Sequence, residues 1–87
     1  MNITDYTSGP WEAKDQWGYI KIHSKDEGVC AVHGLGVNSQ ANARLISAAP
    51  DLLQVARDYV LLCQLHGMEG AVLDSALSAI AKAEGKA

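Results

Sequence analysis

Residues 39–66, SQANARLISAAPDLLQVARDYVLLCQLH, decide the fold, because they form the longest segment with helical periodicity. Apolar side chains recur there at steps of three and four, which places them on one face of a helix: Ala41, Leu45, Ala48, Leu52, Ala56, Tyr59, Val60 and Cys63. Pro50 interrupts the segment, since proline has no amide hydrogen and disfavours helical geometry in the residue before it. We therefore predict that the helical run breaks or kinks at Ala48 and Ala49 and restarts with Pro50 in its first turn.

The ends of the helical half follow from capping residues. Asn38 or Ser39 can accept hydrogen bonds from the first free amides, so the first helix is expected to begin near Gln40. Gly67 is expected to end the second helix. A third helix, from Glu69 or Gly70 to about Glu84, then folds back antiparallel on the second. Its narrow apolar seam consists of Val72 or Leu73, Ala76, Leu77, Ile80 and Ala83.

The segment before this helical half has strand character. β-Branched and aromatic residues alternate with polar ones over residues 11–15, 17–23 and 29–33. Residues 24–28 form a turn in which Gly28 supplies the positive φ. One face of the resulting sheet, directed at the helices, is expected to carry Ile20, Ile22, Cys30 and Val32.

The predicted fold is a single α+β domain over residues 1–87. After a loosely ordered tail (1–9), a three-stranded antiparallel β-meander (10–38) is followed by a kinked helix and a C-terminal α-helical hairpin (39–84). Length supports one domain, because 87 residues bury only one modest core.

Composition restricts the class of function. The net charge of −3 gives no support for binding to a phosphate backbone, so direct DNA binding is not expected. Two cysteines without a signal peptide favour reduced thiols, and no apolar run reaches membrane-spanning length. We therefore expect a soluble cytoplasmic protein with no membrane partner.

Residues 41–53, ANARLISAAPDLL, resemble the A-N-A-x-L-I-A-A-A-P-E-L-L block of many small phage and prophage proteins of unassigned function. Gly9-Pro10-Trp11 likewise resembles the G-P-W segment that precedes the meander in that group. The resemblance implies a viral or prophage origin and action in the cytoplasm of an infected or lysogenic bacterium. It also implies stoichiometric binding to a host molecule.

The sharpest chemical alternative is a metal site. Cys30 with His33, and Cys63 with His66, form two C-x-x-H pairs that together could hold a tetrahedral zinc ion. Residues three apart on a strand point to opposite faces, whereas on a helix they share one. We therefore expect no metal and no other cofactor, with buried thiols and polar histidines as the simpler interpretation.

No enzyme signature is present, so catalysis is not expected. The candidate binding residues are aromatic or carry a guanidinium group, since aromatic faces stack on ligands and arginine clamps phosphate or carboxylate: Trp11, Trp17, Tyr19, Arg44 and Arg57. The alternatives are that one tryptophan fills the core and that Arg44 makes a surface ion pair.

The second helix is apolar over more than one face, which favours self-association into a dimer or larger homo-oligomer. The predicted interface residues are Leu53, Val60, Leu61, Leu62 and Leu65. The function expected from the sequence is that of a non-enzymatic phage accessory protein that binds and inhibits a host defence protein. A sponge that sequesters a nucleotide signal between subunits and a small zinc-binding module are the alternatives.

Overall fold

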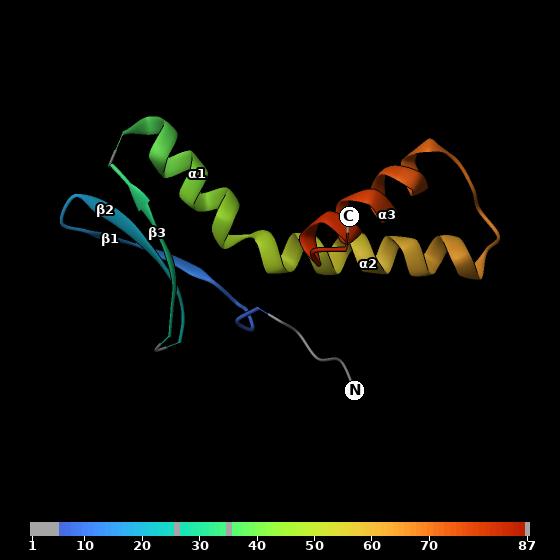
Figure 1. The fold of residues 1–87 in the computed structure, drawn as a ribbon, viewed down its shortest axis with the longest axis horizontal. Coiled ribbons are helices and arrows are strands. Elements are labelled where there is room, and N and C mark those ends of the chain that lie inside the picture. Colours follow the sequence, from blue (N-terminus) through green and yellow to red (C-terminus); the bar gives the residue numbers. More distant parts are fainter. Residues whose placement is uncertain (1–5, 26, 35, 87) are drawn as a thin grey trace. The chain divides into compact units, whose positions relative to one another are not determined.

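The computed structural model describes residues 6–25, 27–34 and 36–86. Along the chain it has β1 (Glu12–Gln16), β2 (Tyr19–Ser24), β3 (Glu27–His33), α1 (Val37–Ser47), α2 (Ala49–Leu65) and α3 (Ala71–Ala83) (Figure 1). This confirms the α+β class and the order of a three-stranded sheet followed by helices. Two compact units divide the chain, Met1–Asp51 and Leu52–Ala87, and each is described by itself.

The sheet of the first unit is an antiparallel meander in the order β1-β2-β3. Trp17 and Gly18 form the β1–β2 turn between the paired residues Gln16 and Tyr19, where Gly18 has φ 81°. The expected strand over residues 17–23 therefore starts two residues too early, because Gly18 adopts a positive φ that a strand does not use. In the second turn the positive φ belongs to Lys25 (49°) and not, as expected, to Gly28.

A β-bulge in β3 changes which residues face the core. Ile22 pairs with Cys30 while His23 pairs with Gly28, so Val29 is an extra residue without a Cα partner. Val29 is half-buried against the core, and Cys30 is exposed. The prediction that Cys30 belongs to the buried face is therefore wrong, since Val29, the extra residue of the bulge, packs against the core instead.

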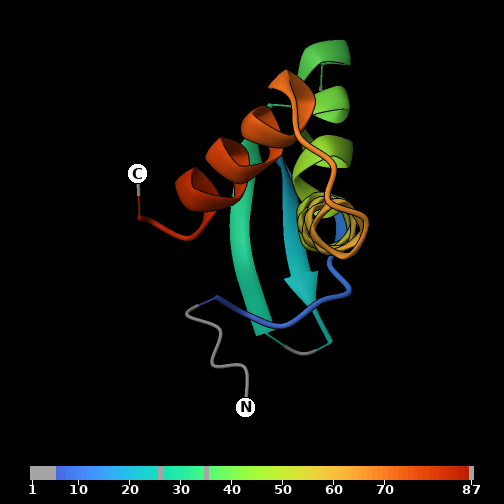
Figure 2. The same cartoon turned by 90° about the vertical axis from the view of Figure 1, so that its right-hand side faces the viewer.

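Helix α1 lies on the sheet and contacts all three strands (Figures 1 and 2). The core between them consists of Ile20, Ile22 and Ala43, with Trp11, Val29, Val32 and Ile46 packed around it. Ala43 is the buried residue of α1, and its methyl side chain lets the helix backbone approach the two isoleucines closely.

The start of α1 differs from the prediction. The helix begins at Val37, its N-cap is Gly36, and no side chain caps it. Ser39 instead donates its hydroxyl hydrogen to the His33 carbonyl at the end of β3 (2.9 Å). The connection from β3 is so short that Ser39 already lies within the helix. Ala41 and Leu45 are exposed, contrary to expectation, because the inward face is that of Ala43 and Ile46.

The helix is interrupted before Pro50, as predicted. α1 ends at Ser47, Ala48 is a turn residue with φ −87° and ψ −4°, and α2 begins at Ala49. The N-terminal segment packs at this point, since a Cβ at Gly9 would lie 3.0 Å from Pro50 Cβ. Thr7 and Ser8 are also held, because their carbonyls accept hydrogen bonds from Trp11 Nε1 (2.9 Å) and Ser24 Oγ (2.5 Å). Residues 1–5 of the expected loose tail lie outside the described residues.

In the second unit α3 returns beside α2. Gly67, with φ 65°, ends α2 as expected: its amide donates to Gln64 and that of Met68 to Cys63, the paired bonds of a Schellman motif. Gly85 ends α3 in the same way. The inward residues of both helices are buried or half-buried: Leu53, Ala56, Val60, Cys63, Leu73, Ala76 and Ile80. No helix in the described residues has the length and apolar character that crossing a bilayer requires.

Candidate functional site

The most exposed large apolar side chain in the described part of the chain belongs to Trp17, which is 98% exposed at the tip of the β1–β2 hairpin. The tip is well supported. Gln16 and Tyr19 pair on either side of it, and the Gly34 amide donates to the Gly18 carbonyl (3.2 Å). A two-residue turn held by a strand on each side thus presents the indole to the surroundings on a backbone with little freedom.

Trp11 and Tyr19 do not form one aromatic platform with Trp17. Trp11 precedes the opposite end of β1, is half-buried against the core and donates its indole hydrogen to the Thr7 carbonyl. The six residues from Trp11 to Trp17 span roughly 20 Å of extended chain. Tyr19 is half-buried beside the tip, opposite His33. The structure therefore separates the predicted aromatic set into one core tryptophan and one exposed tryptophan with a neighbouring tyrosine.

Arg44 borders a shallow hollow between α1 and the β1–β2 hairpin. Ala13, Asp15, Ile20, Gln40 and Ala43 line the remainder of this hollow, which has a volume of about 210 Å³. Small-molecule sites usually measure about 300–1,000 Å³. The hollow alone is thus too small for a nucleotide, and the Asp15 carboxylate in its lining opposes an anion.

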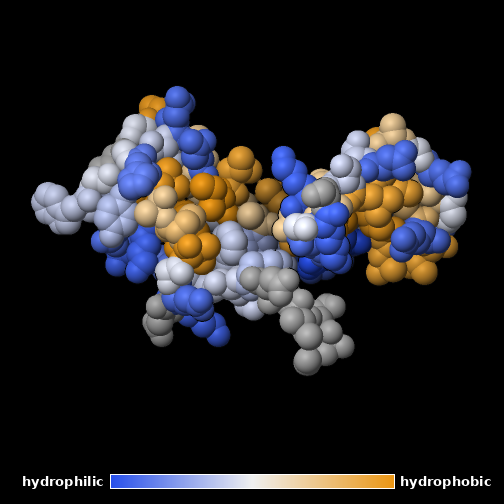
Figure 3. All heavy atoms as spheres, in the orientation of Figure 1, coloured by the Kyte–Doolittle hydropathy of each residue, from blue (hydrophilic) through white to orange (hydrophobic). Residues whose placement is uncertain are grey.

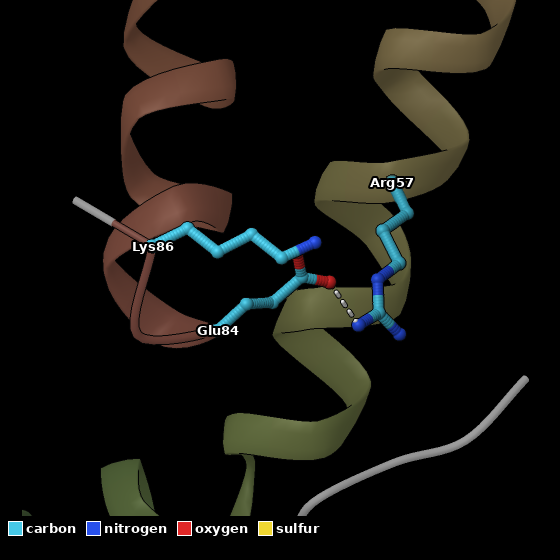
Figure 4. A network of polar contacts seen from close by, with 3 residues as sticks. All are labelled: Arg57, Glu84 and Lys86. Carbon is cyan, nitrogen blue, oxygen red and sulfur yellow. Dashed lines mark hydrogen bonds and ion pairs between the residues drawn. The ribbon is translucent and has the colours of Figure 1, made fainter.

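Arg57 is engaged inside the second unit. Its Nη2 donates to Glu84 Oε2 (2.5 Å), and Lys86 Nζ lies 3.4 Å from the other carboxylate oxygen (Figure 4). The hydrogen bond from Arg57 lowers the pKa of Glu84 below its usual value, with Lys86 adding to the effect and partial burial opposing it. This contact holds the end of α3 against the first half of α2, so the Arg57 guanidinium already has an anionic partner.

The α2–α3 hairpin exposes many large apolar side chains (Figure 3). They are Leu52, Val55, Leu61, Leu62, Leu65, Met68, Val72 and Leu77. Leu61, Leu62 and Leu65 of the predicted oligomer interface are among them, whereas Leu53 is half-buried and Val60 is buried inside the hairpin. Tyr59 is half-buried at the edge of this surface. A hydrogen bond with the Cys63 thiol raises the pKa of Tyr59 above the ordinary value of a phenol.

The candidate metal ligands are distributed over both units. Cys30 and His33 are exposed on β3, Cys63 is buried in α2, and His66 is exposed after the end of α2. Nowhere in residues 6–25, 27–34 and 36–86 do three histidine, cysteine, aspartate or glutamate side chains gather as a metal ion would need. The geometry of the described residues thus adds nothing in favour of the zinc alternative.

The sequence interpretation assigned Leu52 to the inward face and did not single out Val55, although the structure exposes both. A signal for them was present. The inward residues of α2 follow one another at steps of three, four and three. A second set of apolar residues has the same steps and begins one position earlier: Leu52, Val55, Tyr59 and Leu62. Two such stripes side by side indicate a helix with two apolar neighbours.

These observations define the class of protein: a small α+β protein with an apolar surface on its helical hairpin and an exposed tryptophan at a β-hairpin tip. The whole chain, residues 1–87, matches the family model of Salmonella phage P22 protein Y8K6, and the chain belongs to this family. The expected relation to small phage proteins is thereby confirmed. No curated protein and no solved structure matches the chain.

Proposed function

We propose that this phage-family protein acts without catalysis, by binding one host protein in a stoichiometric complex anchored by Trp17. The observation that carries the proposal is the 98% exposure of this indole at a hairpin tip that two neighbouring strands support. Tryptophan is the residue type most enriched among the energetic hot spots of protein interfaces, and a supported turn loses little conformational entropy on binding.

The indole of Trp17 would contribute a large share of the binding free energy. A tryptophan side chain buries about 150–250 Å² on contact. At about 25 cal/mol per Å², this corresponds to roughly 4–6 kcal/mol of gross transfer free energy. Truncation of such an anchor typically costs about 2 kcal/mol or more, which is roughly a 30-fold loss of affinity.

The proposed target is a protein of the host defence against phage, and the proposed place of action is the cytoplasm of the infected or lysogenic bacterium. The family supports this choice, because the match is to a phage protein. Occupying a surface of a larger protein requires only a small domain with an exposed anchor, which is what the first unit offers.

The test begins with affinity-tagged wild-type protein recovered from infected host cells and identification of the protein bound in equimolar amount. The purified target is then titrated with wild-type, Trp17→Ala and Val37→Ala proteins by calorimetry. Val37 is a suitable control because it is an apolar residue of the same unit with 82% exposure. We expect a 1:1 stoichiometry, a loss of at least 30-fold for Trp17→Ala, and no change for Val37→Ala.

Equal dissociation constants for Trp17→Ala and wild type would contradict the anchor. In phage plating assays, expression of the wild-type protein is expected to restore infection of a host that carries the defence protein, and Trp17→Ala is expected to fail. Restoration by both proteins alike would contradict the role of Trp17 in inhibition. A rise in melting temperature on addition of cyclic nucleotides would support the sponge alternative in place of a protein target.

A further inference from the structure

Helix α2 carries two apolar stripes of identical spacing. Leu53, Ala56, Val60 and Cys63 form the inward stripe, which is buried or half-buried. Leu52, Val55, Tyr59 and Leu62 form the second stripe, called here the open seam, of which only Tyr59 is half-buried and the other members are exposed. The hairpin itself thus uses one of the two stripes and leaves the other in contact with solvent.

The ion pair between Arg57 and Glu84 fixes the side of the hairpin on which the open seam lies. At about 100° per residue, Arg57 and the open seam project on opposite sides of the inward stripe of α2. In α3, by the same spacing, Glu84 projects on one side of the half-buried residues, and Val72, Ala79 and Ala83 project on the other. Because Arg57 and Glu84 form an ion pair, the side of α2 that carries Arg57 and the side of α3 that carries Glu84 lie on the same side of the hairpin (Figure 4). The open seam and the exposed stripe of α3 therefore share the opposite side.

The spacing of the open seam selects a helix as its occupant. Its steps alternate between three and four residues, which is the 3.5-residue repeat by which side chains of one helix fit between those of a neighbouring helix. The seam contains no charged side chain, since its members are leucine, valine and a neutral tyrosine. A four-helix bundle provides two neighbours for each helix, and a two-helix hairpin provides one.

The available area corresponds to that of a stable dimer. With about 100 Å² for a fully exposed large apolar side chain, the open seam and the α3 stripe offer on the order of 400 Å² of apolar surface per copy. A symmetric pair would remove about twice this area from water. If apolar atoms make up about 60% of the buried surface, the total area buried in the dimer is roughly 1,300 Å², which is within the range of specific protein interfaces. The second unit, residues 52–87, is also shorter than the about 40 residues below which a unit usually needs outside support.

We infer that the open seam of α2 packs against the same seam of a second copy of this chain, so that two α2–α3 hairpins form a four-helix bundle. This contact is isologous, and each copy contributes the same residues to it across a two-fold axis. It is separate from the proposed contact of Trp17, and it makes the complex with the host protein bivalent.

Leu61 and Leu62 provide a matched pair for the test. They are consecutive leucines of α2 with 54% and 52% exposure, but only Leu62 belongs to the open seam. Light scattering at about 100 μM, with reductant to exclude disulfides through the exposed Cys30, is expected to give a dimer mass for wild type and Leu61→Glu. Leu62→Glu and Val55→Glu are expected to give a monomer mass with the circular dichroism of a folded helical protein.

A monomer mass for the wild type would overturn the inference. So would a dimer that Leu61→Glu and Leu62→Glu dissociate to the same extent. If the glutamate variants unfold, the wild-type melting temperature decides instead. For a dimer it rises with protein concentration, because association stabilises the folded chain by mass action. A melting temperature that stays constant from 1 to 100 μM would also overturn the inference.

Discussion

Ile22→Ala is expected to destabilise the first unit more than any substitution on its surface. Ile22 is 0% exposed, lies between the sheet and α1, and touches the core formed with Ile20 and Ala43. Removal of a buried isoleucine side chain down to alanine costs about 2–5 kcal/mol through lost transfer energy and the remaining cavity. Because the whole chain of 87 residues is expected to have only about 4–13 kcal/mol of stability, this loss is a large fraction of the total.

Trp11 allows a direct measurement of this effect, since it packs against the same core. In a Trp17→Phe background, Trp11 is the sole tryptophan, and its fluorescence in a urea titration reports unfolding of the first unit. With a slope of about 1 kcal/mol per M for a small unit, a loss of about 3 kcal/mol lowers the midpoint by roughly 3 M. Val37→Ala, at a position with 82% exposure, is the control and is expected to change stability by less than about 0.5 kcal/mol. Equal midpoints for Ile22→Ala and Val37→Ala would refute the assignment of Ile22 to the core.

Three further substitutions test the helix termini and the ion pair of the second unit. Gly67→Ala is expected to lower stability by about 1–2 kcal/mol, because alanine is strained at φ 65°. Gly36→Ala, at φ −72°, carries no such strain and is expected to cost less than about 1 kcal/mol, the loss of glycine at an N-cap. Thermal denaturation that ranks the two variants equally would contradict this reasoning. The pKa of Glu84 is lower in the folded chain than in the unfolded chain, where it is about 4.3. Its ion pair with Arg57 therefore stabilises the fold fully above about pH 4.3, and this contribution is lost as the pH falls through the folded pKa. Glu84→Gln lacks this ion pair, so the variant is expected to lose less stability than wild type on acidification. Melting temperatures from pH 6 to pH 3 that decline in parallel for wild type and Glu84→Gln would disprove the contribution.

Features that depend on a few neighbouring residues could be predicted from the sequence. The break before Pro50 follows from a missing amide hydrogen, and the end of α2 follows from Gly67, the residue type that most easily adopts a positive φ. The meander followed by helices was accessible for the same reason, since alternation and helical periodicity are local patterns. Membership in a phage family was indicated by residues 41–53 and is confirmed over the whole chain.

The candidate site was accessible only in part. Both tryptophans were recognised as binding candidates, but Trp17 was expected within a strand, so Trp11, which fills the core, was not distinguished from Trp17, which is exposed. The difference arises because Gly18 places Trp17 in a turn, while the extended chain carries Trp11 to the opposite end of β1. The burial of a side chain depends on residues that are distant in sequence, and a periodic pattern does not include them.

Local sequence patterns specify where the helices break and end, which segments become strands, and that α2 has more apolar surface than one neighbour can cover. The orientation of each face depends on packing between elements. Val29 at the bulge packs against the core while Cys30 is exposed, and Ala43 rather than Ala41 or Leu45 is the inward residue of α1. In both places a shift of one or two residues along the chain exchanges buried and exposed positions, and the shift is set by packing against another element, which the local pattern does not contain.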